Sequence, residues 1–230
     1  MTDPIRTAAS TATRTAAIER QESVLATNKV LRNTYLLLAL TLLFSAATAG
    51  TAMALEMPYL GPWVTLGGYF LLLFLTTRFS NSAVGLVCVF ALTGFMGMTL
   101  GPLLAHYLQM PGGPQLVTNA LAITGITFVG LSAYAISSRR DFSFMGGFLV
   151  AGILVAFLCG LAALFFEMPT LALAVSAMFV LLMVGLILFQ TSSIIHGGET
   201  NYILATVTLY VSIYNLFTSL LHLLGVMSDD

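Results

Sequence analysis

The stretch Gln190–Phe217, QTSSIIHGGETNYILATVTLYVSIYNLF, joins two long apolar runs through a short polar junction. Paired glycines at Gly197–Gly198 interrupt the chain there, because glycine breaks helices and favours turns. Polar side chains crowd the junction and continue into the second run. Such groups are costly at membrane depth unless they face a protein interior or a water-filled cavity. The stretch predicts two membrane helices joined by a tight turn, and a functional site near that turn.

The rest of the chain has the composition of a membrane protein. Of its 230 residues, 58% are hydrophobic and 7% are charged, and the mean hydropathy is +0.98. A soluble domain has about 25% charged residues. Each apolar run approaches the length of about 20 residues that a membrane helix needs. The seven runs cover residues 34–55, 61–76, 83–104, 116–136, 144–166, 172–189 and 202–224. We therefore predict an all-α integral membrane protein, in which residues 29–230 form one domain, a seven-transmembrane helix bundle.

Residues 1–28 precede the first run and have a different composition. They are rich in Ala, Thr, Ser and Arg and contain no apolar run. Such a segment buries too little apolar surface to fold by itself, so we expect a disordered cytosolic tail. We expect no cleavable signal peptide, because the first apolar run is too long for the apolar segment that precedes an A-x-A cleavage site.

The positive charges predict how the chain crosses the bilayer. All eight Lys and Arg residues lie in the tail or in the second and fourth loops: Arg6, Arg14, Arg20, Lys29, Arg32, Arg78, Arg139 and Arg140. Cytoplasmic loops are enriched in Lys and Arg. We expect a multi-pass protein of a bacterial inner membrane, with a cytoplasmic N-terminus and a periplasmic C-terminus.

Small residues spaced by four predict close contacts between helices. Gly97 and Gly101 have this spacing in the third run, and Gly152 and Gly160 belong to a similar series in the fifth. Small side chains let two helix backbones approach closely. We expect these glycines to mark helix contacts within the bundle.

Five polar residues form the candidate regulatory cluster: Gln190, His196, Glu199, Ser212 and Asn215. His196 and Glu199 are close enough in sequence to pair. They form either a helix cap in a solvated loop or a cluster that senses protons or a partner. Ser212 and Asn215 share one helical face. That face either makes hydrogen bonds between helices or lines a small hydrated cavity.

The sequence contains little that would support catalysis. Zinc needs three or four clustered ligands, whereas the three histidines are expected near opposite membrane faces. Ser132, in the sequence Gly-Leu-Ser-Ala, is a weak nucleophile motif, and no nucleotide-binding fingerprint occurs. We therefore predict no enzyme activity, no catalytic residue, no metal, no cofactor and no nucleic-acid partner.

Several motifs together resemble a known family of membrane proteins. They are KVLRNTY at Lys29–Tyr35, TGFMGMTLGPLL at Thr93–Leu104, RRDFSFMGG at Arg139–Gly147, HGGETNY at His196–Tyr202, and LYVSIYNLF ending at Phe217. With these motifs the chain resembles the Bax inhibitor-1 family of seven-helix membrane proteins. Within the family it is most similar to a bacterial subgroup that modulates the membrane-anchored, ATP-dependent zinc protease FtsH.

The resemblance implies a modulator without catalytic activity. Such a protein associates with FtsH and its membrane-bound accessory complex, and it restrains the degradation of other membrane proteins while being a slow substrate itself. The alternative function is a pH-sensitive calcium or cation leak, as proposed for other family members. Their paired aspartates correspond to Gln190 and Ser212 here. Neither side chain carries a negative charge at neutral pH, whereas calcium favours carboxylate ligands.

Overall fold

The computed structural model describes the backbone of residues 4–228 and the side chains of residues 29–227. The described chain is helical throughout, and its helices are joined by short loops. In order they are α1 (Pro4–Ala54), α2 (Pro62–Arg78), α3 (Ala83–Leu108), α4 (Gly113–Ser138), the 3-10 turn η1 (Ser143–Met145), α5 (Gly146–Phe165), α6 (Pro169–Ile195) and α7 (Tyr202–Ser228). The predicted all-α fold is confirmed. Four of the seven apolar runs each lie within one helix, the first and second extend one residue beyond α1 and α2, and the fifth covers η1 and α5 and ends one residue after α5.

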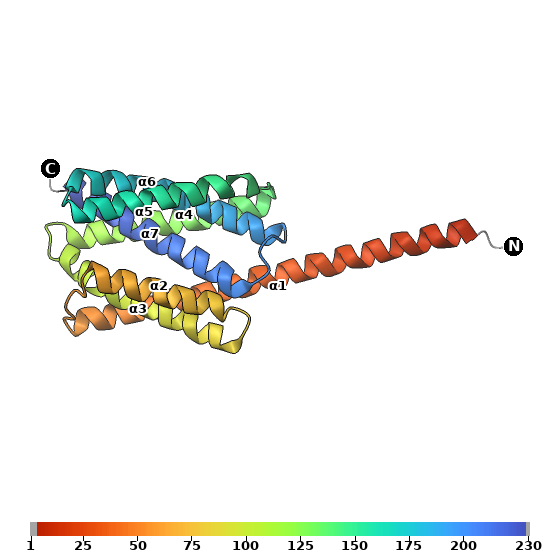
Figure 1. The fold of residues 1–230 in the computed structure, drawn as a ribbon, viewed down its shortest axis with the longest axis horizontal. Helices are drawn as coiled ribbons and strands as arrows, with labels where there is room; N and C mark the ends of the chain where they lie inside the picture. Colours follow the sequence, from red (N-terminus) through yellow and green to blue (C-terminus); the bar gives the residue numbers. More distant parts are fainter. Residues whose placement is uncertain (1–3, 229–230) are drawn as a thin grey trace.

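Six of the described helices are long and apolar enough to cross a membrane: α1 from Lys29 onward, α3, α4, α5 with η1, α6 and α7. The exception, α2, has 17 residues and is therefore about 25 Å long. It nevertheless runs alongside the other helices and joins opposite ends of the bundle (Figure 1). It lies at the short end of the range for a membrane helix.

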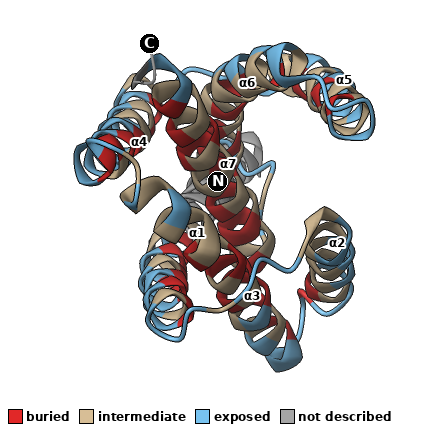
Figure 2. Ribbon diagram, turned by 90° about the vertical axis from the view of Figure 1, so that its left-hand side faces the viewer, coloured by how far each residue is buried: buried red, intermediate tan, exposed pale blue. Residues whose placement is uncertain are grey.

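The bundle is built around α7. The view along the bundle shows α7 between α1, α3, α4 and α6, with buried positions along its length (Figure 2). In its most apolar window 56% of the residues are buried, against 17–44% for the other five candidate spans. The polar stretch of the sequence that ends at Phe217 therefore lies largely in the protein interior rather than against lipid.

Two of the predicted glycines form a tight seam between α1 and α3. A Cβ atom at Gly97 would collide with the Ser45 carbonyl and the Thr48 side chain. At Gly101 it would lie 2.6 Å from the Ala52 Cβ. Both collisions involve the backbone or its first side-chain atom, which cannot move away easily. The α3 backbone can therefore approach α1 this closely only with glycine at these positions.

The glycines of α5 face α6 but are packed less tightly. A Cβ atom at Gly152 would lie 2.6 Å from Cδ2 of Leu182, the end of a flexible side chain. At Gly160 it would lie 3.6 Å from a methyl of Val175, an ordinary contact distance. The two series of small residues therefore differ: the seam of α3 is rigid, while that of α5 has room to adjust.

The first half of α1 differs from the sequence expectation. Residues 4–28, expected to be disordered, have a helical backbone that continues without interruption into the membrane span. This half of α1 projects from one end of the bundle (Figure 1). Residues 5–49 contain neither Gly nor Pro, and Ala, Arg, Glu and Gln favour helix. Residues 1–3 of the expected tail lie outside the described residues.

Candidate functional site at the basic end of the bundle

The loop between α6 and α7, residues 196–201, begins with a tight turn. Gly197 has φ +76°, a left-handed conformation that only glycine adopts without strain. Gly198 N–H then donates to the Ser193 carbonyl at 2.8 Å. The Gly197 N–H also donates to the Ile194 carbonyl at 3.3 Å. The two bonds close the C-terminal end of α6 in the manner of a Schellman cap. The paired glycines therefore end the helix, as the sequence predicts.

The end of α6 holds the neighbouring loop between α4 and η1, residues 139–142. The Ser192 hydroxyl donates to the Arg140 carbonyl at 3.1 Å and accepts the Phe142 N–H at 3.0 Å. The Ser192 side chain is almost fully buried. A buried hydroxyl that satisfies both a backbone donor and a backbone acceptor fixes the loop in one conformation.

His196 strengthens the same link through both ring nitrogens. Nε2 lies 3.1 Å from the Arg139 carbonyl, and Nδ1 lies 2.9 Å from the Ser192 carbonyl. Arg139 itself has φ +49°, a left-handed conformation that is costly for a residue with a side chain. A neutral imidazole has one N–H and donates to one carbonyl, whereas the imidazolium donates to both.

Asp141 adds a negative charge to this loop. Its carboxylate accepts the Ser143 N–H at 2.8 Å. Hydrogen bonds from the backbone and side chain of Ser143 lower the pKa of this exposed carboxyl group, and the nearby His196 acts in the same direction. The carboxylate form is thus the one that caps the turn at η1.

Asn201 links the same loop to a third one, the loop between α2 and α3, residues 79–82. Its Nδ2 donates to the Ser80 carbonyl at 3.1 Å and to Oδ1 of Asn81 at 2.9 Å. Its Oδ1 accepts the N–H groups of Ile203 and Leu204 and so caps α7. The α2–α3, α4–α5 and α6–α7 loops therefore meet at one end of the bundle.

Every positive charge of the chain belongs to this end. Arg78 ends α2, Arg139 and Arg140 follow α4, and the other five basic residues lie between residues 6 and 32 of α1. We call this the basic end. The positive charges placed the second and fourth loops on the same side of the membrane as the N-terminal segment, and these parts of the chain do lie at one end of the bundle.

The predicted pairing of His196 with Glu199 does not occur. His196 faces the α4–α5 loop, whereas Oε1 of Glu199 accepts the N–H of Asn201 at 2.7 Å. Glu199 thus supports the loop before α7. The sequence left two interpretations open, a helix cap in a solvated loop or a cluster that senses protons or a partner. The contact between Glu199 and the Asn201 N–H fits the helix cap.

The other three members of the predicted cluster lie deeper and apart. Gln190 is 5% exposed, and its Nε2 has no hydrogen-bond partner among the described residues. The Ser212 hydroxyl donates to the Thr208 carbonyl of its own helix at 2.7 Å. Asn215 lies 14 residues beyond Asn201 in sequence, which is about 20 Å along α7. The five residues therefore do not form one site.

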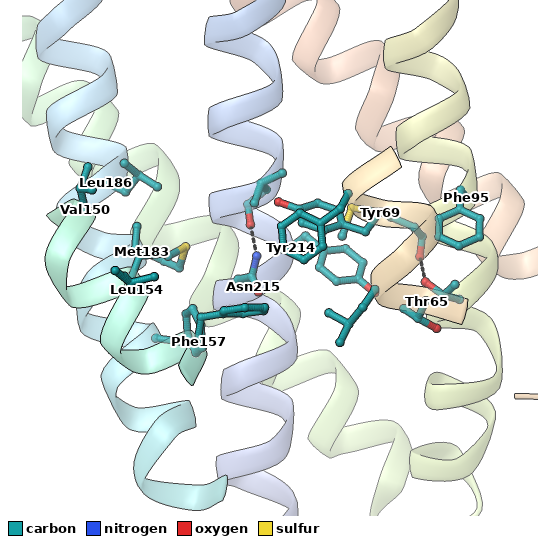
Figure 3. A pocket seen from close by; sticks show the side chains of 17 residues that line it. Thr65, Tyr69, Phe95, Val150, Leu154, Phe157, Met183, Leu186, Tyr214 and Asn215 are labelled. Carbon is teal, nitrogen blue, oxygen red and sulfur yellow. Dashed lines mark hydrogen bonds between the residues drawn. The ribbon is translucent and has the colours of Figure 1, made fainter. Parts of the chain in front are cut away.

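Asn215 borders a cavity of about 590 Å³ between α2, α3, α5, α6 and α7. Its Nδ2 donates to the Val211 carbonyl of its own helix at 2.8 Å. Apolar side chains such as Phe157 and Met183 surround it, with the hydroxyl groups of Thr65, Tyr69 and Tyr214 among them (Figure 3). The hydrated cavity that the sequence left open is thus mostly apolar.

Sequence reasoning missed the buried bond that fixes α1 on α7. The Ser45 and Tyr210 hydroxyl oxygens are 2.6 Å apart, and the Tyr210 hydroxyl also donates to the Thr93 carbonyl at 3.3 Å. The two bonds are compatible when Ser45 donates to Tyr210. These residues are 165 positions apart, so periodicity along one helix contains no signal for the pair.

The chemistry available in the described residues is hydrogen bonding between loops. No group of three or more His, Cys, Asp or Glu side chains within the described part of the chain has an arrangement suited to a metal ion. Ser132 is buried, and its hydroxyl has no partner among the described residues, so no base activates it there.

The fold and this end together define a multi-pass helical membrane protein whose loops are tied at one basic face. Residues 27–229 match the family described as inhibitor of apoptosis-promoting Bax1, and the chain belongs to this family, Bax inhibitor-1. The family and the membrane fold predicted from the sequence are confirmed.

The chain is also similar to individual proteins. The chain is 51% identical to the Modulator of FtsH protease YccA of Escherichia coli strain K12 over 208 residues, which cover 90% of this chain and 94% of that protein. The same identity and coverage hold for an Escherichia coli O6:H1 protein named inner membrane protein YccA. An uncharacterized Pseudomonas aeruginosa protein is 52% identical over 94% of this chain and 96% of its own length. The prediction of a protein without catalytic activity agrees with the name of the Escherichia coli relative, a modulator of a protease.

Proposed function

We propose that this protein restrains an FtsH-type membrane protease by engaging it as a slowly degraded substrate, so that other membrane proteins are degraded more slowly. The similarity to the Escherichia coli modulator over 90% of the chain supports this proposal. The accessory complex of the protease is a second proposed partner. The observation that carries the mechanism is the form of α1, which combines a projecting end with a tightly packed one.

The projecting half of α1 is the proposed handle. Residues 4–28 would extend about 37 Å as a helix, beyond the end of the bundle that contains the basic loops (Figure 1). An ATP-driven protease needs a free chain end to pull. We propose that this end is cytoplasmic and that the C-terminus is periplasmic, because all Lys and Arg residues belong to this side.

The membrane half of α1 is the proposed obstacle to extraction. It is seated against α3 at Gly97 and Gly101, where the backbones touch. It is also joined to α7 by the Ser45–Tyr210 hydrogen bond. The Thr206 hydroxyl of α7 donates mainly to the Tyr202 carbonyl of its own helix at 2.7 Å and lies 3.3 Å from the Thr34 carbonyl of α1. Pulling on α1 must break these contacts together, because they hold it against both α3 and the central helix α7. A substrate that is bound but extracted slowly occupies the protease.

The test is a reconstituted degradation assay with the protease, this protein and a second membrane substrate. We expect the intact protein to slow the loss of the second substrate. A variant without residues 1–27 should persist longer than the intact protein, because its handle is gone, and should inhibit less. Equal turnover of the trimmed and intact proteins would contradict the proposed handle.

The alternative of a calcium leak gains no specific support from the described residues. The positions of the family's aspartates are Gln190, whose amide is buried, and Ser212, whose hydroxyl bonds to its own helix. The nearest carboxylate of the predicted cluster, Glu199, is engaged by a backbone N–H. Calcium favours several oxygen ligands at once, and these side chains do not converge on one point.

A further inference from the structure

We propose that the pocket between the α2–α3 loop and the start of α7 is a binding site for a phosphate group. This inference is independent of the protease proposal. The pocket, of about 520 Å³, lies at the basic end and includes the first residues of both α3 and α7. The residues that line it and enter the argument are Ser80, Asn81, Ser82, Ala83, Thr200 and Asn201.

The α3 end of this pocket offers free backbone donors. Ser82 precedes α3, but its hydroxyl donates back to the Phe79 carbonyl at 2.9 Å and therefore does not cap the helix. The N–H groups of Ala83 and Val84 have no acceptor among the described residues, and no acidic residue lies in the first turn of α3. Unpaired N–H groups at a helix N-terminus attract anions, and phosphate is one ligand of this kind.

A side-chain hydroxyl, that of Ser80, supports the site independently of the helix. Ser80 is 7% exposed and lines the pocket. Its hydroxyl makes no hydrogen bond within the described part of the chain, although its carbonyl accepts the Asn201 side chain. A phosphate oxygen in the pocket would accept from this hydroxyl.

The surrounding charges are compatible with an anion. Arg78 ends α2 two residues before Ser80, with its guanidinium 6.0 Å from the centre of the Phe79 ring. The nearest carboxylate in sequence, Glu199, does not line the pocket and is already bonded to the Asn201 N–H. At α7 the Ile203 and Leu204 N–H groups are taken by Asn201. The site therefore depends on α3 and Ser80 for its free donors.

The location allows two sources of phosphate. The pocket lies at a bundle end, where lipid headgroups meet water, and the basic residues there favour anionic lipids. A lipid phosphate and free inorganic phosphate present the same oxygen acceptors. The proposal concerns that shared chemistry, and the experiment separates the sources.

Binding is measured on the full-length protein in a neutral detergent, after removal of bound lipid. Inorganic phosphate is titrated by calorimetry. A short-chain phosphatidic acid is titrated by native mass spectrometry beside the diacylglycerol of the same chains, which lacks the phosphate. We expect the phosphatidic acid to bind and the diacylglycerol not to bind at this site.

Three variants remove separate parts of the site. Ser80→Ala removes the side-chain hydroxyl. Ala83→Pro removes one backbone donor at the first helical position, where proline is tolerated, and Ser82 already has the extended backbone (φ −131°, ψ 164°) that a residue before proline requires. Asn81→Asp keeps the oxygen that accepts from Asn201 and adds a negative charge. The matched control is Asn119→Asp, on an exposed turn of α4 whose Asn119 oxygen likewise accepts an amide hydrogen bond.

We expect about tenfold weaker phosphate binding in Ser80→Ala and Ala83→Pro, as for the loss of one charge-assisted hydrogen bond, and no binding in Asn81→Asp. The control should bind normally. Loss of phosphatidic acid binding alone identifies the lipid as the source, and loss of inorganic phosphate binding alone identifies the free ion. Absence of binding in the unmodified protein, or equal binding in all variants, overturns the proposal. Helix content measured by circular dichroism confirms folding, and Ser80→Ala carries the test if Ala83→Pro fails to fold.

Discussion

At the scale of single residues, Ser192 has the largest part in joining the loops of the basic end. Its one hydroxyl satisfies the Phe142 N–H and the Arg140 carbonyl, some 50 positions away in sequence. His196, one turn later, adds a bond to Arg139. The α4–α5 loop is therefore held by side chains of α6 rather than by its own backbone.

Ser192→Ala should leave both backbone groups without their partner and lower the free energy of unfolding by about 1–3 kcal/mol. The neighbouring Ser193→Ala is the control, since the Ser193 hydroxyl makes no hydrogen bond with the described residues. Thermal unfolding in detergent measures the stability, and amide hydrogen exchange at Phe142 reports the loop. Equal protection of Phe142 in both variants would contradict the assigned role.

Acidic pH should loosen the turn at η1. The pKa of Asp141 is lowered in the folded protein from its ordinary value of 3.8, so its contribution is present above that value and is lost as pH falls through the lower folded value. The protection factor of the Ser143 amide, which compares its exchange rate with the intrinsic rate at the same pH, should fall on acidification below about pH 4. In Asp141→Asn this pH response should disappear. An unchanged acid response in the variant would show that another group controls the turn.

The candidate residues were predictable one by one, but their partners were not. His196 and Glu199 stand at the loop because a polar junction between apolar runs is visible in the sequence. The loop contacts of Ser192 and the buried Ser45–Tyr210 bond join residues 50 and 165 positions apart. Such pairs arise from helix packing, which hydropathy along one segment does not encode. The predicted five-residue cluster therefore separates into loop and membrane positions.

At the scale of elements, the contact of α1 with α3 is the stiffest feature of the bundle. Gly97→Ala would place a methyl group against the Ser45 carbonyl and the Thr48 side chain. We expect this overpacking to lower the free energy of unfolding by about 1–3 kcal/mol. Gly125→Ala in α4, where a Cβ atom meets nothing within 4 Å, should be neutral or stabilising by up to about 1 kcal/mol. Unfolding in detergent compares the two, and equal stability would refute the seam.

The helices were predictable because a segment that crosses lipid must satisfy the hydrogen bonds of its backbone polar groups within itself. The ends of the helices were less predictable. Hydropathy places the end of the sixth run at residue 189, whereas α6 continues to Ile195, because Thr191 and Ser192 are buried by neighbouring helices. The first helix starts 30 residues before its apolar run, since helix propensity there is not interrupted. Hydropathy detects the lipid-facing part of a helix but not its full length.

At the scale of the whole molecule, the basic end should face the cytoplasm. In a variant without Cys88 and Cys159, a single cysteine replacing Ser143 should resist a membrane-impermeant thiol reagent added to spheroplasts. One replacing Met227, an exposed residue near the other end of the bundle, should react. Permeabilised cells provide the control for reactivity. The reverse labelling pattern would contradict the proposed orientation.

The central claim is that inhibition of the protease depends on how slowly α1 leaves the bundle. The most direct measurement is to follow, in one reconstituted reaction, the degradation of this protein and of a second membrane substrate, with the Gly97→Ala and Gly125→Ala variants. The account predicts that Gly97→Ala is degraded faster than the unmodified protein and protects the second substrate less, while Gly125→Ala matches the unmodified protein. Faster degradation of Gly97→Ala with undiminished protection would contradict it.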